Sequence, residues 1–231
     1  MEKTNYPGHE QSYQKKRQTS EYVGWLKRNE FEEDWTQSWQ KILQKSQFPK
    51  QGKVIELGCG AGNISISLAQ LGYKVVGIDI APTAIAWAKE NAIQANVNVQ
   101  FIEGNLLEMA EFPGAPFDIV IDGRCLHCII GKDREQFLKV THGLLNPGGI
   151  LAINTMCNEV PQTPHFQQYF DPVSRCTIQN GISTRYIGDS NDILQEVIRA
   201  GFRMISVEVF PPQNQGDAAD LQIIAKKVLE K

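Results

Sequence analysis

Short apolar runs alternate with segments of helical period through the middle of the chain. Five apolar runs predict strands, at residues 53–57, 74–78, 97–102, 117–121 and 150–154. Apolar residues at spacings of three and four predict helices at residues 63–71, 82–95, 132–145 and 189–200. This alternation is typical of parallel β-α-β units. It restricts the chain to α/β folds in which helices cover both faces of the sheet.

The two ends of the chain show different patterns. Residues 1–18 are polar and are expected to form a frayed arm, followed by helices at residues 20–29 and 31–45. Two late apolar runs, at residues 204–210 and 221–227, have no helix between them and should pair antiparallel. We therefore divide the chain into an N-terminal extension, residues 1–48, and a main domain, residues 49–231.

One stretch of the main domain, residues 156–188, has no clear period. Long irregular segments inside a compact domain are commonly functional. Because this stretch follows the fifth predicted strand, we expect it to fold as a lid over a substrate pocket at that end of the sheet, although its aromatic side chains are equally compatible with an ordinary core.

Charge and cysteine content exclude several function classes. The 231 residues carry 23 basic and 26 acidic side chains, and the net charge of −3 argues against nucleic-acid binding by bulk electrostatics. No apolar run reaches the ~18 residues needed to span a bilayer, and the first residues lack a secretory signal. Five cysteines, an odd number, argue against a disulfide framework. We therefore expect a cytoplasmic protein with neither a nucleic-acid nor a membrane partner.

A glycine-rich turn follows the first predicted strand. Gly58, Gly60 and Gly62 come directly after it, and a helix begins at Asn63. Such a turn lets a ligand approach the backbone at the carboxyl end of a parallel sheet. A dinucleotide fingerprint would have glycine where this chain has Asn63, and no Gly-Lys-Ser/Thr of a P-loop follows. A nicotinamide-dependent oxidoreductase is therefore disfavoured.

An acidic residue at the end of the second predicted strand is the second part of this candidate ligand site. Asp79 lies 21 residues after Gly58. A carboxylate at this position can accept hydrogen bonds from a ribose diol. By itself such an aspartate is more often a helix cap, here ahead of Pro82. At the right distance from the glycine turn, the ribose interpretation is the better one.

Further motifs follow in order. They are Gly77-Ile-Asp-Ile80, Glu103-Gly-Asn-Leu106, Phe117-Asp-Ile-Val-Ile-Asp122 and Leu145-Asn-Pro-Gly-Gly-Ile-Leu151. Together with Glu56-Leu-Gly-Cys-Gly-Ala-Gly62 they resemble the successive motifs of class I S-adenosylmethionine-dependent methyltransferases over residues 53–155. The resemblance implies a doubly wound, Rossmann-like α/β fold with seven strands in the order 3-2-1-4-5-7-6, the last strand being antiparallel.

The resemblance also implies a binding site for S-adenosylmethionine and its product S-adenosylhomocysteine. Residues implied to cradle the methionine end are Glu56, Gly58, Cys59, Gly60 and Gly62; those implied to bind ribose and adenine are Asp79, Ile80, Asn105 and Leu106. Asn105 stands where the family commonly has aspartate, and its amide oxygen can accept the same hydrogen bond. A leading helix often closes the site in this architecture, so Trp35 is expected to contact the cofactor.

The segment after the fourth predicted strand is expected to face the acceptor. His127 is a candidate base or hydrogen-bonding group for the substrate, or is simply packed at the rim. Arg124 is a candidate ligand of the cofactor carboxylate or of an anionic substrate, or is solvated. Because a sulfonium methyl group is already activated, alignment of the acceptor is the main task and a base is optional. Cys125 and Cys128 have no second pair, so we expect no metal site.

We therefore expect methyl transfer to a small-molecule acceptor, mainly by positioning, by a monomer or homodimer. A thiol, selenol or metalloid acceptor is an alternative, because Glu33-Asp-Trp35-Thr-Gln-Ser-Trp39 partly resembles the thiopurine and thiol methyltransferase branch. A protein that binds the cofactor without turnover is another. A nucleic-acid base methylator is disfavoured, since Asp122-Gly-Arg-Cys125 replaces the Asp/Asn-Pro-Pro-aromatic motif of many such enzymes.

Overall fold

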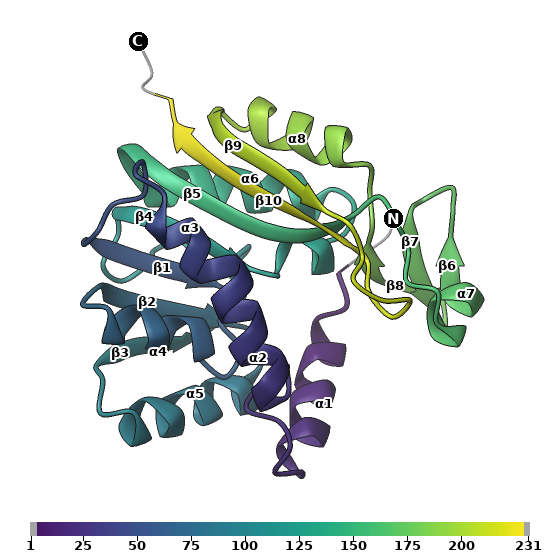
Figure 1. Cartoon of the computed structure of the whole chain (residues 1–231), viewed down its shortest axis with the longest axis horizontal. Coiled ribbons are helices and arrows are strands. Elements are labelled where there is room, and N and C mark those ends of the chain that lie inside the picture. Colours follow the sequence, from purple (N-terminus) through teal and green to yellow (C-terminus); the bar gives the residue numbers. More distant parts are fainter. Residues whose placement is uncertain (1–3, 229–231) are drawn as a thin grey trace. The chain divides into compact units, whose positions relative to one another are not determined.

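A computed structural model of the chain describes residues 4–228 (Figure 1). Its main strands are β1 (Lys53–Leu57), β2 (Lys74–Asp79), β3 (Val99–Glu103), β4 (Phe117–Gly123), β5 (Leu145–Cys157), β9 (Phe202–Phe210) and β10 (Ala219–Lys227). They form a seven-stranded sheet in the order β3-β2-β1-β4-β5-β10-β9. β1 is parallel to β2 and β4, and β2 to β3, whereas β10 is antiparallel to both β5 and β9. The predicted sheet, including its antiparallel last strand, is confirmed.

The chain divides into two compact units. The N-terminal unit is Tyr6–Gly123, and the C-terminal unit joins the described residues before Tyr6 to those from Arg124 onward. In each unit the strands are apolar on both faces: Ile55, Ile78 and Ile119 in the first, and Leu151 and Ile223 in the second, are fully buried. Continuous burial of this kind is what a sheet covered on both faces requires.

The helices of the N-terminal unit differ in part from those expected. They are α1 (Tyr6–Arg17), α2 (Arg28–Asp34), the π-helical turn η1 (Trp35–Trp39), α3 (Gln40–Gln44), α4 (Asn63–Gln70) and α5 (Pro82–Gln94). The frayed arm and the helix at 20–29 were wrong predictions. The polar residues 6–17 are helical because their few apolar and acidic side chains contact α5, while residues 20–27 turn back through a bridge between Tyr22 and Lys27.

The C-terminal unit contains η2 (Leu126–Cys128), α6 (Asp133–Leu144), α7 (Pro164–Tyr169) and α8 (Ser190–Arg199). The stretch without a period holds α7 and a small antiparallel sheet, β6 (Phe170–Asp171), β7 (Cys176–Gln179) and β8 (Ile182–Tyr186), drawn in green in Figure 1. This insertion is therefore a folded element. None of the helices described has the length and hydropathy to cross a bilayer.

Candidate functional site

The glycine turn after β1 has a backbone that only glycine adopts without strain. Gly60 has φ +54° and Gly62 has φ +80°, both in the left-handed region. A Cβ atom on Gly62 would lie 2.6 Å from the ring of Phe101, and one on Gly60 would collide with the hydroxyl of Tyr13. Both the conformation and the surrounding space therefore require glycine here.

Asp79 ties the end of β2 to this turn. Its Oδ2 accepts a hydrogen bond from Gly60 N, and its Oδ1 accepts one from Ala81 N at the start of α5, both at 2.8 Å. Burial raises the pKa of Asp79, although these backbone hydrogen bonds oppose the shift. The structural and ribose-binding interpretations are compatible, because a carboxylate has about four lone-pair sites and the backbone groups of Gly60, Ala81 and Ile80 use three of them.

Glu56 on β1 carries the most perturbed carboxyl group of the site. It is 2% exposed, and its Oε2 accepts a hydrogen bond of 2.5 Å from Ser65 Oγ on α4. Burial raises its pKa to about 8, and the neighbouring carboxylates of Asp79 and Asp122 add to the shift, while the Ser65 hydrogen bonds oppose it. Gly123 at the end of β4 leaves room for this carboxyl group, since a Cβ there would lie 2.6 Å from Glu56 Oε1.

Asp122 is a candidate site residue that the sequence analysis quoted in a motif without giving it a role of its own. It is fully buried at the end of β4, so three carboxyl groups, those of Glu56, Asp79 and Asp122, lie buried at the carboxyl ends of adjacent strands. Besides burial, Asp79 and Asp122 both raise the pKa of Glu56, and a cationic ligand beside Glu56 would favour its ionised form. The acidic final residue of the run Phe117-Asp-Ile-Val-Ile-Asp122 was the available signal.

This donor set fits S-adenosylmethionine, which carries a sulfonium and an ammonium group beside a carboxylate. Glu56 and Asp122 would hold its positive end, and the glycine turn from Gly58 to Gly62 would lie beside it. Asp79 at the next strand end would bind its ribose.

Four more of the predicted cofactor residues, Cys59, Ile80, Asn105 and Leu106, lie in the same N-terminal unit. Cys59 is buried in an apolar cluster with Phe101 and Ile85. Leu106 is buried, and Ile80 is half-buried next to Asp79. Asn105 Oδ1 accepts a hydrogen bond of 3.1 Å from Leu107 N. A role of its side chain toward adenine stays a prediction.

The N-terminal segment Tyr6–Lys27 packs on the glycine turn and on α5. The Tyr13 hydroxyl lies against Gly60, and Gly24 lies against Ala61 and Asn63 of the turn. Glu10 accepts hydrogen bonds from Thr83 N and Oγ1 at the start of α5, at 3.0 and 2.5 Å.

Arg17 adds a third anchor, an ion pair of 2.6 Å with Glu90 on α5. Sequence reasoning missed Glu10, Tyr13 and Arg17, because their partners are 73 residues away or, for Tyr13, in the glycine turn. Trp35 is half-buried in η1, its ring 6.4 Å from that of Phe31.

His127 lies in the C-terminal unit, on the short helical turn η2. It is 6% exposed, and its Nδ1 is 3.5 Å from Thr155 Oγ1 on β5. The turn is held by Arg134, whose Nη1 donates to the carbonyls of Leu126 and Ile129, at 2.7 and 3.2 Å.

Arg134 is itself buried. Its guanidinium pairs with Glu196 on α8 at 2.6 Å and lies 4.3 Å from the ring centre of Tyr186. The position of His127 therefore depends on a buried arginine that sequence reasoning did not identify.

Arg124 forms a two-fold ion pair with Asp220 on β10, with N–O distances of 2.8 and 2.9 Å. Its φ of +68° is in the left-handed region, uncommon for a residue with a side chain. The predicted contact of Arg124 with the cofactor carboxylate is untested.

The five cysteines of the chain are all free thiols, and among residues 4–228 no group of three or more His, Cys, Asp or Glu side chains is arranged to hold a metal ion. Burial raises the pKa of the Cys157 thiol to about 12, so this thiol stays protonated at neutral pH.

Known proteins support the same interpretation. Residues 49–201 match the family model described as "Methyltransferase domain". The chain is 33% identical over 104 residues to a ubiquinone biosynthesis O-methyltransferase of Azorhizobium caulinodans, covering 45% of this chain and 40% of that protein. An uncharacterised methyltransferase of Synechocystis sp. is 37% identical over 101 residues, 44% of this chain and 45% of its own length. The chain thus spans about half the length of these curated relatives.

Solved structures show the same fold. A SAM-dependent methyltransferase of Methanosarcina mazei aligns with a TM-score of 0.67 at 21% identity, covering 80% of this chain and 96% of that one. The 1,6-didemethyltoxoflavin-N1-methyltransferase of Burkholderia thailandensis, solved with S-adenosylhomocysteine, aligns with a TM-score of 0.62 at 17% identity, covering 87% of each chain. The family match spans well over half of the sequence, so this chain belongs to the methyltransferase-domain family, and it shares the fold of the SAM-dependent methyltransferase of Methanosarcina mazei.

Proposed function

We propose that the chain transfers the methyl group of S-adenosylmethionine to a small-molecule acceptor. The observation that carries this proposal is the group of three buried carboxyls beside the glycine turn, with the pKa of Glu56 raised to about 8. When bound, the cofactor supplies a methyl group on a positively charged sulfur. The protein's task is then to bind the donor, orient the acceptor and keep water out.

Residue roles follow from this proposal. Glu56 and Asp122 stabilise the positive end of the donor, Asp79 binds the ribose, and Ile80 and Leu106 pack on the adenine. In the C-terminal unit His127, held by Arg134 and near Thr155, hydrogen-bonds the acceptor. Arg124 binds the donor carboxylate only if it leaves Asp220.

The N-terminal segment Tyr6–Lys27 is proposed to close the cofactor site. Three anchors support this role: Glu10 with Thr83, Arg17 with Glu90, and Tyr13 against Gly60. Tyr13→Ala should weaken cofactor binding, whereas Gln11→Ala, an exposed position on the same helix, should not. Equal affinities in the two variants would make Tyr13 a packing residue only.

Binding calorimetry tests the function itself. S-adenosylhomocysteine should bind, and NAD should bind weakly or not at all. Tight NAD binding without a response to S-adenosylhomocysteine would refute the proposal. Labelled donor with a panel of metabolites then identifies the acceptor, and absence of transfer to every compound would favour a cofactor-binding protein without turnover.

We further propose that the protein acts in the cytoplasm as a monomer or homodimer, without a nucleic-acid partner. Five free thiols support a reducing compartment, and the net charge of −3 supports the absence of nucleic acid.

A further inference from the structure

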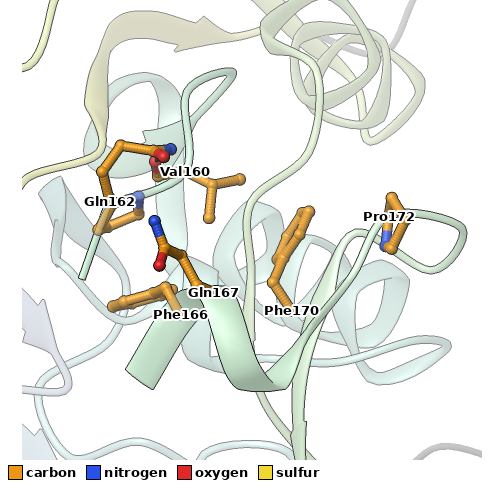
Figure 2. Close-up of a pocket in the computed structure, with 7 residues that line it drawn as sticks. Val160, Gln162, Phe166, Gln167, Phe170 and Pro172 are labelled. Atoms are coloured by element: carbon orange, nitrogen blue, oxygen red, sulfur yellow. Dashed lines mark hydrogen bonds between the residues drawn. The ribbon is translucent and has the colours of Figure 1, made fainter. Parts of the chain in front are cut away.

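The insertion after β5 contains a pocket of about 280 Å³ (Figure 2). Its walls come from the loop after β5, from α7, and from β6 with the residue that follows it; they consist of Val160, Pro161, Gln162, Phe166, Gln167, Phe170 and Pro172. None of these seven side chains carries a charge. The pocket therefore offers apolar surface and two amide groups.

The frame around the pocket is fixed by hydrogen bonds at the base of the insertion. Arg175 donates to Asn158 O at 2.6 Å and to Ile187 O at 2.8 Å, and Asn158 Oδ1 accepts from Ser190 N at 2.8 Å. On the wall itself, Gln162 N donates to Gln215 O at 2.7 Å. Arg175 and Asn158 both have positive φ, a conformation that the surrounding bonds must maintain. The pocket is thus preformed.

Its lining selects the shape and charge of an occupant. Two phenylalanine rings and two prolines favour a flat apolar body by ring packing. A charged group would lose its hydration without gaining an ionic partner from these side chains, which disfavours charged ligands. Figure 2 shows the amides of Gln162 and Gln167 at one end of the pocket and Pro172 at the other, so a polar group of the ligand belongs at the amide end.

The volume of the pocket limits the size of the ligand that it can hold. An engineered apolar cavity of about 150 Å³ holds benzene, so a pocket of about 280 Å³ suits a molecule of one or two fused rings.

The location of the pocket indicates that its ligand is the methyl acceptor. β5 ends at Cys157, and the pocket begins three residues later at Val160, on the carboxyl side of a strand of the parallel sheet. Ligands of such sheets bind at the carboxyl ends of the strands. The same end of β5 carries Thr155, beside His127.

We propose that this pocket binds the methyl acceptor, and that the acceptor is an uncharged planar molecule of one or two rings with a hydrogen-bonding group at one end. The inference rests on the proposed methyltransferase function and names its substrate class.

This inference can be tested by titrating the full chain with 1-naphthol in the presence of S-adenosylhomocysteine. Ligand NMR monitors the binding of 1-naphthol. The charged analogues 1-naphthyl phosphate and 1-naphthylmethylamine serve as comparison. We expect 1-naphthol to bind about tenfold more tightly than either analogue, and Phe170→Ala to weaken its binding about tenfold. Phe170→Leu, which keeps apolar volume, covers the case in which the alanine variant does not fold.

The two neighbouring glutamines of α7 provide a matched control. Gln167 lines the pocket and Gln168 does not, while both are exposed. Gln167→Ala should weaken 1-naphthol binding, and Gln168→Ala should leave it unchanged. No binding of 1-naphthol, equal binding of the charged analogues, or equal affinity of the Gln167 and Gln168 variants would overturn the inference. Calorimetry with S-adenosylhomocysteine on the same samples distinguishes failure of this inference from failure of the proposed function. If S-adenosylhomocysteine binds normally, only the assignment of the acceptor pocket is refuted.

Discussion

Glu56 provides the most direct test of the proposed site, through the pH dependence of stability. Its pKa is about 8 in the folded protein against 4.5 for an exposed glutamate. Between these values the folded protein holds a proton that the unfolded chain has lost, so the free energy of unfolding falls as the pH rises. At about 1.4 kcal/mol per pKa unit, the loss amounts to about 3 kcal/mol by pH 7 and about 5 kcal/mol above pH 8. Domains of this size have about 5–15 kcal/mol in total.

Glu56→Gln should remove this dependence. A glutamine keeps the shape and still accepts the Ser65 hydrogen bond, but it never ionises. Urea unfolding from pH 5 to pH 9 should therefore show similar stability of the two proteins at pH 5 and a more stable variant at pH 8. Asp79 also has a raised pKa, and its desolvation by burial is present in both proteins. Glu111→Gln, at an exposed position, is the control. Parallel curves for the wild type and Glu56→Gln would refute the buried-carboxyl argument.

Ligand binding extends the same test. If the positive end of the donor lies beside Glu56, binding favours the ionised carboxylate, and the protein releases a proton on binding below pH 8. The affinity for S-adenosylmethionine should rise by up to about tenfold per pH unit between pH 6 and pH 8. Calorimetry in buffers of different ionisation enthalpy measures the proton release directly. An equal release in Glu56→Gln would place the donor's charge elsewhere.

Three further predictions concern single side chains. Asp79→Ala should weaken the binding free energy of S-adenosylhomocysteine by about 1–3 kcal/mol, measured by calorimetry, and unchanged affinity would leave Asp79 as a cap of α5. Arg134→Met should lower the free energy of unfolding by about 3 kcal/mol, because Glu196 loses its buried partner; urea titration measures this, and Arg134→Met with Glu196→Leu should recover part of it. His127→Ala should lower the rate of methyl transfer by less than the ~100-fold expected for loss of a general base; a much larger loss with intact cofactor binding would indicate an oxygen or nitrogen acceptor deprotonated by His127.

The sheet was predictable because each of its strands is a local pattern. β1, β2 and β4 are buried on both faces, so each appears in the sequence as a continuous apolar run. The turn at Gly60 was predictable for a related reason, since a positive φ admits few other residues.

Helix α1 was missed because its own sequence has almost no apolar period. Within Tyr6–Arg17 only Tyr13 is buried. The helix is stabilised by contacts that are distant in sequence, those of Glu10 with Thr83 and of Arg17 with Glu90. Tertiary contacts of this kind override weak local propensity, and sequence spacing contains no record of them.

The difference between local patterns and contacts distant in sequence also explains why the sequence indicated a cofactor but not an acceptor. Glu56, Gly60 and Asp79 lie within 24 residues, at or next to strand ends whose spacing the fold determines. The pocket around Phe166 and Phe170 depends instead on a short helix and a small sheet, held by Arg175 and Asn158 through main-chain carbonyls. Bonds to carbonyl groups leave no side-chain pattern in the sequence, so the insertion looked irregular although it is folded. The proposed acceptor pocket thus lies in the part of the structure that local patterns describe least.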